Sequence, residues 1–380
     1  MPYVQSITDV LTTYLGWHRA RLKFIARFQA ALLMLQTTNL SKIAASLKGG
    51  VEIASNYRRI QRFLSDYALD FTALGRLLLH LLPQSGPYVA VLDRTEWYFG
   101  ETPVNILMMG IAHKSVAFPI AWKVLSSGGG SGAQSHIDVL ERFLAIVDSA
   151  SIKAVVADRE FISAAWLAHL QERNIPFAIR LRSNRGIGMS AEEGSEEGAE
   201  AGPVLPVRMF ARTVRLGTEE ILGDRYLLGE GGTKVKTNVV VRRIASDEAK
   251  DPFLILATWN LDPTSASALY RTRWEIETLF AALKSRGYDL EATHLTKPDR
   301  IQRLIGLLAL TFAWTHLIGE HRAGREGPPP KKRHGRRSKS LFRYGLDRLQ
   351  SVLTTPEGQG EAFFRCLSVL RSPTAYLSYA

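Results

Sequence analysis

Apolar runs and the polar residues that interrupt them predict a mixed α/β core over residues 86–182. Tyr88–Leu92 and Ile152–Ala157 are continuous apolar runs, as buried strands have, and they lead directly into Asp93 and Asp158. Three further strands are predicted, at Val104–Ala112, Val116–Leu125 and Ile175–Leu181. One helix is predicted to end near Asp148 and another to cover Phe161–Arg173, so the element order is β-β-β-α-β-α-β.

After residue 252 the pattern takes a helical period. Leu269–Tyr288 has no proline and no glycine before Gly287, and its apolar residues fall on one side of a helical wheel. Next to this apolar face, four polar residues form a stripe along the helix: Tyr270, Arg273, Glu277 and Lys284. They supply a phenol, a guanidinium, a carboxylate and an ammonium group, respectively. Glu275 points away from this stripe. The stripe is either a solvated ladder of ion pairs, or a site in which Glu277 holds a metal ion and the other three residues hold phosphates.

Residues 1–85 are predicted to form a basic helical domain. Within it, Ser41–Leu47 and Glu52–Asp66 read as two short helices joined by a glycine turn. The second helix has an apolar face that includes Ile53 and an opposite basic face, formed by Arg58, Arg59 and Arg62 and accompanied by Ser55 and Asn56. Such a pair is similar to a helix-turn-helix DNA reader, and the alternative is a small bundle with a basic soluble surface. We favour DNA contact because the whole chain is basic.

The chain leaves the core over residues 183–251 and returns through the apolar run Phe253–Thr258. Short strands separated by glycine turns predict a β-rich insertion, with strands at Val207–Leu216, Arg225–Leu228 and Lys234–Arg243. Residues 190–202 carry five glutamates and no basic residue, which is typical of a mobile acidic loop. Residues 252–325 complete the core, and residues 326–380 form a basic C-terminal segment with a helix at Leu341–Leu353.

The composition of the chain indicates what kind of partner it binds and in which compartment it works. The 380 residues carry a net charge of +12 and have a pI of about 9.8, which favours a polyanionic partner. The single Cys366 excludes a disulfide framework and a cysteine zinc cluster, and it suits a reducing compartment. The N-terminus has no secretory-signal pattern, and no uncharged apolar run reaches the ~18 residues of a membrane span. We therefore expect a soluble cytoplasmic protein without a membrane partner.

Asp93, Asp158 and Glu277 follow one another in an order that predicts a metal site. If the first and fourth strands are adjacent and parallel, both aspartates leave the sheet at the same edge, where a packed helix could bring Glu277 to meet them. Three converging carboxylates repel one another and have raised pKa values unless cations neutralise them. Mg²⁺ prefers oxygen ligands, and two such ions can activate an attacking oxygen and stabilise a leaving oxygen at phosphorus.

Three local words make this pattern specific: VLDRTEWYFG around Asp93, VVADREF around Asp158, and Y-x2-R-x3-E-x6-K around Glu277. With them the sequence resembles, over most of its length, bacterial insertion-sequence transposases of the DDE class that carry the YREK signature. The resemblance implies a ribonuclease-H-like catalytic core with a β-rich insertion before the glutamate helix. It also implies that the three carboxylates ligate two Mg²⁺ ions, for which Mn²⁺ can substitute. Phosphates at the end of the mobile element would then be held by Tyr270, Arg273 and Lys284.

The same resemblance implies a cut-and-paste reaction. A homodimer would bind double-stranded DNA at the terminal inverted repeats, cut it by metal-assisted hydrolysis, close and reopen a hairpin, and join the 3′-OH ends to target DNA. A base-stacking aromatic residue is expected where the insertion returns; Phe253 and Trp259 flank that return, although both also suit core positions. Two rival functions are a ribonuclease-H-like endonuclease without strand transfer and a DNA-binding protein without catalysis. Ordinary surface or core positions are expected for His113, His136, His294 and His316.

Overall fold

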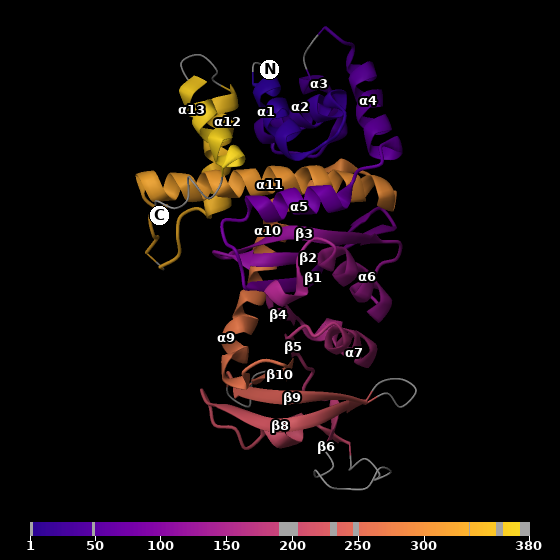
Figure 1. Cartoon of the computed structure of the whole chain (residues 1–380), viewed down its shortest axis with the longest axis vertical. Coiled ribbons are helices and arrows are strands. Elements are labelled where there is room, and N and C mark those ends of the chain that lie inside the picture. The colour runs from indigo at the N-terminus through magenta and orange to yellow at the C-terminus, as the bar shows by residue number, and fades with distance from the viewer. Residues whose placement is uncertain are drawn as a thin grey trace.

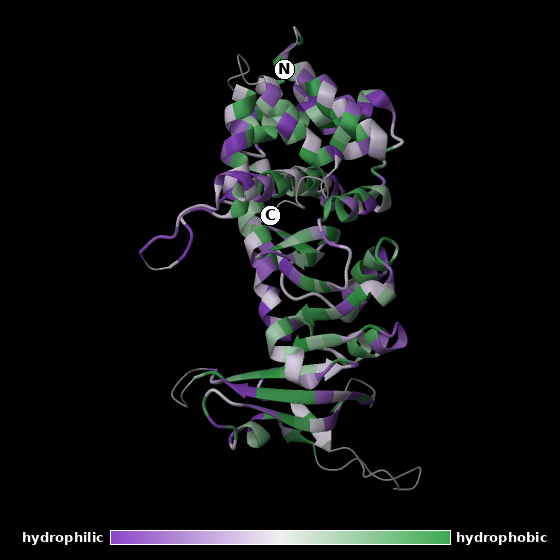
Figure 2. Ribbon diagram, turned by 60° about the vertical axis from the view of Figure 1, so that its left-hand side comes forward, coloured by the Kyte–Doolittle hydropathy of each residue, from purple (hydrophilic) through white to green (hydrophobic). Residues whose placement is uncertain are grey.

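The computed structural model describes residues 3–47, 50–189, 204–228, 234–245, 251–333, 335–354 and 360–372. The acidic loop predicted at residues 190–202 lies outside them. In Figure 1, helices from both ends of the chain lie at the top, a sheet fills the middle, and the strands of the insertion lie at the bottom. Figure 2 shows apolar residues concentrated on the strands and on the helices packed around them.

One mixed sheet runs through the core and the insertion. Its strands among the described residues are β1 (Tyr88–Phe99), β2 (Thr102–His113), β3 (Val116–Leu125), β4 (Ile152–Ala157), β5 (Phe177–Arg180), β6 (Gly186–Met189), β7 (Leu205–Pro206), β8 (Glu219–Leu228), β9 (Lys234–Arg243) and β10 (Phe253–Trp259). Their order across the sheet is β3-β2-β1-β4-β5-β10-β9-β8-β6-β7, and β4 is parallel to both β1 and β5. This mixed α/β architecture agrees with the ribonuclease-H-like core expected from the sequence.

The pairing of β1 with β4 places the two aspartates together. These strands are parallel neighbours with Leu92 opposite Ala157, so Asp93 and Asp158 are the next residues on each. The prediction that the first strand ends at Asp93 is wrong, because β1 continues to Phe99 through its antiparallel pairing with β2. β4 does end at Ala157, and Asp93 therefore lies where β1 loses its parallel partner.

The insertion extends the core sheet. β10 pairs with β5 on one side and with β9 on the other, so the strands of residues 183–251 continue the same sheet. The strand predicted at Val207–Leu216 is wrong, because the helix α8 (Arg208–Ala211) occupies part of this stretch. Val207, Ala211 and Val214 are all buried, and their spacing of four and three residues is that of one helical face.

Helices cover the sheet and build both ends of the chain. The remaining α-helices are α1 (Val4–Tyr14), α2 (Arg19–Leu35), α3 (Leu40–Ser46), α4 (Ile53–Asp66), α5 (Phe71–Leu81), α6 (Ala133–Leu144), α7 (Ala164–Glu172), α9 (Ala266–Tyr270), α10 (Trp274–Leu283), α11 (Pro298–Glu326), α12 (Leu341–Thr354) and α13 (Gly360–Arg371). The core helices predicted from the periodicity correspond to α6 and α7.

The helix predicted over Leu269–Tyr288 is shorter and less regular than expected. A 3₁₀ turn at Arg271–Arg273 separates α9 from α10, although the backbone keeps right-handed helical dihedral angles through it. α10 ends before Lys284, whose ψ of −135° leaves the helix. The ring of Tyr288 is fully buried and packs edge-on against Phe342 of α12. The chain leaves the helical path early because this ring has to reach α12.

α11 is the central helix of the molecule. In Figure 1 it crosses between the sheet and the terminal helices, and it contacts β3, α2, α5, α12 and α13. By length and composition alone α11 could cross a membrane, but 94% of its most apolar 18-residue window is buried inside the protein. Its apolar surface is therefore used in the core.

The two short helices predicted near the N-terminus are present as α3 and α4. Asn56 does not belong to the basic face, because it is buried and its amide nitrogen donates to the carbonyl oxygen of Leu47 at 2.9 Å. Ile53, predicted to lie on the apolar face, is 57% exposed. The amide of Asn56 satisfies the end of α3, so the packing of α3 on α4 turns Asn56 inward and leaves Ile53 outside.

Candidate active site

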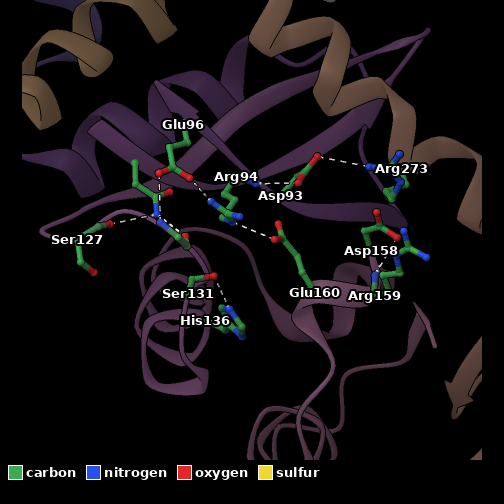
Figure 3. Close-up of polar contacts among 12 residues, drawn as sticks. Asp93, Arg94, Glu96, Ser127, Ser131, His136, Asp158, Arg159, Glu160 and Arg273 are labelled. Carbon is green, nitrogen blue, oxygen red and sulfur yellow. Dashed lines mark hydrogen bonds and ion pairs between the residues drawn. The ribbon is translucent and has the colours of Figure 1, made fainter. Parts of the chain in front are cut away.

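Asp93 and Asp158 lie side by side where β1 and β4 part (Figure 3). Asp93 is 9% exposed, and its Oδ1 accepts a hydrogen bond from the Arg94 amide at 2.8 Å. Asp158 caps the 3₁₀ turn Arg159–Phe161, and its Oδ1 accepts from the Arg159 amide at 2.8 Å. Each carboxylate is thus oriented by the backbone that follows it.

Arg273 lies between Asp93 and Glu277. Its guanidinium is buried, with Nη1 3.4 Å from Oδ2 of Asp93 and Nη2 2.6 Å from Oε1 of Glu277. Tyr270, one turn earlier, donates its hydroxyl to Oδ1 of Asp158 at 3.2 Å. The i, i+3, i+7 spacing of these helix residues therefore places the phenol against Asp158 and the guanidinium against Asp93, and Arg273 links the Glu277 carboxylate to Asp93.

Burial sets the electrostatics of this group. It raises the pKa of Asp93 to about 7, an effect that the Arg94 amide and the Arg273 guanidinium oppose and that Glu277 increases. Burial also raises the pKa of Tyr270 above its ordinary range, so the phenol stays protonated and donates at neutral pH. A carboxyl with a pKa near 7 is only partly ionised at neutral pH, and a cation placed against it favours the ionised form.

The donor set fits divalent metal ions. Asp93, Asp158 and Glu277 offer only carboxylate oxygens, the ligands that Mg²⁺ prefers. Within the described ranges, no three His, Cys, Asp or Glu side chains already stand at metal-binding spacing. The Arg273 guanidinium supplies the positive charge that a metal ion would supply between Asp93 and Glu277. A metal ion held by these carboxylates would have to displace the guanidinium from them.

Sequence reasoning missed a second layer of ion pairs behind the aspartates. Arg94 donates from Nε to Glu160 at 3.0 Å and from Nη1 to Glu96 at 2.9 Å (Figure 3). On β5, Nη1 of Arg180 lies 3.9 Å from Oδ1 of Asp158. Arg94, Glu96 and Glu160 belong to the segments DRTE and DRE. The alternating charges that follow each aspartate were therefore the sequence feature that could have predicted these ion pairs.

Two further residues of the predicted helix lie away from the carboxylates. Lys284 follows the end of α10, donates to the carbonyl oxygen of Glu96 at 3.2 Å, and covers the Trp97 ring at 5.1 Å. The amine of Lys284 therefore contacts β1 at Glu96, which is three residues after Asp93 in the sequence. Glu275 accepts from the Ser115 amide at 3.2 Å and thus points away from the stripe, as its helical position predicts.

The aromatic residues expected to stack on a base are not the ones nearest the carboxylates. Phe253, at the start of β10, is 7% exposed. Trp259 is the last residue of β10 and pairs with Phe177 at the start of β5, whereas Asp158 lies near the other end of β5. Trp274 is 61% exposed at the start of α10, and its ring centre is 4.5 Å from the guanidinium carbon of Arg273. Only its exposure, which the sequence does not show, distinguishes Trp274 from a core tryptophan.

Arg59 and Arg62 line a groove of about 660 Å³ in the N-terminal helices. The same groove is lined from α2 by Arg21, Lys23 and Arg27. The sequence does not predict that these α2 residues join the basic surface, because no local pattern places α2 beside α4. Arg58 lies on α4 but outside the lining of this groove.

The four histidines predicted to be ordinary residues lie in other parts of the fold. His113 and His316 both face the buried carboxylate of Glu320, with Nε2 at 2.8 and 3.1 Å from its Oε1. His136 is buried on α6, and burial lowers its pKa to about 4. His294 follows a 3₁₀ turn after α10 and stacks on a neighbouring aromatic ring.

Two aspartates on neighbouring strands of an α/β sheet, with a glutamate on a helix beside them, are the arrangement expected of a DDE enzyme that acts on DNA. The chain belongs to the transposase DDE domain family, whose model matches residues 85–314, more than half of the chain. This membership indicates transposase activity and DNA as the substrate.

Two other comparisons add nothing to the assignment. No match was found among curated proteins. Among solved structures, endonuclease V from Bacillus subtilis matches at 12% identity with a TM-score of 0.24, over 70% of this chain and 95% of that chain. A TM-score this low supports no conclusion about fold or function.

Proposed function

We propose that this transposase cuts and joins DNA at the ends of a mobile element in the cytoplasm, with Asp93, Asp158 and Glu277 as its catalytic carboxylates. The observation that carries the proposal is that Tyr270 contacts Asp158, while Arg273 contacts both Asp93 and Glu277. The net charge of +12 supports a large polyanionic substrate.

The three carboxylates would hold two Mg²⁺ ions, or Mn²⁺ in their place. When bound, the ions would activate an attacking oxygen and stabilise the leaving oxygen at phosphorus. We assign the phosphates of the element's end to Tyr270, Arg273 and Lys284. Tyr270 serves as a donor because burial keeps its phenol protonated. Arg273 neutralises Asp93 and Glu277 in the free protein, and it becomes available to a DNA phosphate when another cation takes its place.

The proposed course of reaction is that of a cut-and-paste transposase with the YREK signature. Water attacks the phosphodiester at the element's end and leaves a 3′-OH, which closes a hairpin with the opposite strand. The hairpin is hydrolysed, and the 3′-OH then joins target DNA. A homodimer holds the two terminal inverted repeats during these steps. An endonuclease on the same core would share the catalytic carboxylates and differ by the absence of joining.

The decisive experiment uses the DNA that flanks the gene. Full-length protein is incubated with a plasmid carrying both flanks, in Mg²⁺, in Mn²⁺ or in EDTA, and the product ends are mapped to the nucleotide. Metal-dependent cuts with 3′-OH ends, followed by hairpins and joined products, are expected. Cutting without joining would favour the endonuclease. The proposal is overturned if no metal-dependent cut is found.

The groove between α2 and α4 is expected to bind backbone phosphates. Replacing Arg59 and Arg62 together by alanine should weaken binding to flank DNA and lower the slope of log K against log salt by about two units, because each lost phosphate contact removes roughly 0.9 unit. Fluorescence anisotropy measured from about 50 to 200 mM salt gives the slope. Arg76→Ala, an exposed change on α5, is the matched control. Arg58→Ala tests the arginine outside the groove. An unchanged affinity and slope for the double variant would make this region a structural bundle only.

Hairpin closure is expected to depend on an accessible aromatic ring. Closure strains the terminal nucleotides, and an extruded base is best held by stacking, worth roughly 1–3 kcal/mol. Trp274→Ala should therefore slow closure on pre-nicked ends by about 5- to 100-fold and leave first-strand nicking of intact ends unchanged. Phe253→Ala and Trp259→Ala test the sequence-based expectation in the same assay. If Trp274→Ala closes hairpins at the parental rate, its ring has no such role.

A further inference from the structure

A separate pocket touches the helix that carries Glu277 on another of its sides. It measures about 650 Å³ and is formed by the turn between β2 and β3, by α10, by α11 and by residues 337–342 at the start of α12. Thr278, the residue after Glu277, lies on its wall. The pocket therefore contacts the helix that presents the catalytic glutamate, while its lining is separate from the aspartates.

Three cations line this pocket: Lys114, Arg337 and Lys339. Lys114 pairs with Glu320 at 2.9 Å and Lys339 with Asp347 at 2.6 Å, yet both lysine side chains remain 52% exposed. Over the part of the chain that the structure describes, Arg337 has no carboxylate within ion-pair distance. The pocket thus has a surplus of positive charge that its acidic neighbours leave available.

Hydroxyl groups, a helix N-terminus and the apolar residues Val116, Leu341 and Phe342 complete the lining. Ser115, Thr278 and Ser340 contribute hydroxyls. Ser340 immediately precedes α12, a helix of 14 residues, and its Oγ accepts from the Arg343 amide at 3.2 Å. The first amides of a helix have no partner within it, and its positive end favours an anion. Cations and hydroxyls are groups that hold phosphate, and the positive end of α12 adds to their field.

His316 is the buried polar residue of the pocket's lining. It is 2% exposed and lines the pocket. Nε2 lies 3.1 Å from Oε1 of Glu320, although neither ring nitrogen meets the full geometry of a hydrogen bond among the described residues. Burial lowers the pKa of His316, and a neutral ring whose Nε2 proton faces Glu320 leaves Nδ1 as an acceptor, so His316 does not itself bind a phosphate.

We propose that this pocket binds a backbone phosphate of DNA and so fixes a DNA strand against the helix that carries Glu277. The inference rests on the proposed function, which supplies DNA as the substrate. The basic segment that leads out of the pocket favours a polymer over a small anion, because residues 321–350 hold ten lysines and arginines against two acidic residues.

The test measures binding of full-length protein to two labelled duplexes of about 40 bp, one of flank sequence and one of random sequence, in EDTA so that nothing is cut. The double variant Arg337→Ala/Lys339→Ala should lower the slope of log K against log salt by about one unit, because one phosphate contact is lost. Thr278→Val removes a hydroxyl without changing the charge and should weaken binding roughly tenfold. Lys153→Ala/Lys234→Ala removes two exposed cations from β4 and β9 and should keep the parental slope. Melting temperatures confirm that each variant is folded.

The outcomes separate this inference from the proposed function. A lower slope on both duplexes supports a site for any DNA backbone, and a lower slope on flank DNA alone supports a site for the element's end. If the parent cuts flank DNA while the pocket variants keep its slope and affinity on both duplexes, the pocket has no phosphate role and the catalytic assignment stands. If the parent neither binds nor cuts DNA, the proposed function and this inference both fall.

Discussion

A single amide substitution, Asp93→Asn, Asp158→Asn or Glu277→Gln, is expected to slow DNA cleavage by about 10³-fold or more while DNA binding is retained. The substitution keeps the size of the side chain but removes the charge that would hold a metal ion. Single-turnover nicking of flank DNA in Mg²⁺ gives the rate, and anisotropy in EDTA gives the affinity. Because Arg273 pairs with Asp93 and Glu277 in the free protein, melting curves without metal should accompany both measurements.

Glu275→Gln is the matched control for Glu277→Gln. Both glutamates lie in the first turn of α10, but Glu275 accepts from the Ser115 amide and points away from Asp93. An amide oxygen at position 275 can keep that hydrogen bond, so cleavage should stay within a few-fold of the parental rate. Parental cleavage by Glu277→Gln, or a loss with Glu275→Gln equal to that with Glu277→Gln, would show that the helix carries its catalytic carboxylate elsewhere.

Gly345→Ala is expected to destabilise the protein by about 3 kcal/mol, at the upper end of the range for an overpacked core. Gly345 of α12 faces α11, where a β-carbon would overlap the carbonyl oxygen of Thr315. Likewise, a β-carbon added at Gly319 of α11 would overlap the carbonyl oxygen of Leu341. A helix backbone cannot give way as a side chain can, so α11 and α12 have to separate. Urea unfolding measures the loss of free energy.

Gly16→Ala is the control for this change. No atom lies within 4 Å of a β-carbon added at Gly16, so the substitution should be close to neutral. Gly319→Ala should resemble Gly345→Ala because the two glycines belong to one contact. A Gly345→Ala protein as stable as Gly16→Ala would mean that α12 is not held as closely against α11 as the structure has it.

The sequence by itself determined the elements whose pattern is local. Continuous apolar runs predicted β1 and β4, and the aspartates that follow these runs were placed correctly relative to the parallel pair. Helical spacing predicted that Tyr270, Arg273 and Glu277 would share one side, because a helix repeats every 3.6 residues whatever surrounds it. The family words around these residues then predicted the DDE class, to which the chain belongs.

Only the tertiary structure decided how far those elements extend and what they meet. β1 runs past Asp93 because β2 continues to pair with it, and α10 ends early because the ring of Tyr288 is buried against α12. The insertion continues the core sheet because β10 pairs with both β5 and β9. Pairing and burial depend on partners that the local pattern does not contain.

The candidate site shows the same division. Its carboxylates could be selected from the sequence, but the 9% exposure of Asp93 and its raised pKa arise from the fold around it. Arg273 reaches Asp93 across 180 residues of sequence, so no local pattern could predict the contact. The 61% exposure of Trp274 and the meeting of α2 with α4 were equally beyond the sequence. Periodicity is fixed by neighbours along the chain, whereas burial, charge environment and access are fixed by neighbours in space.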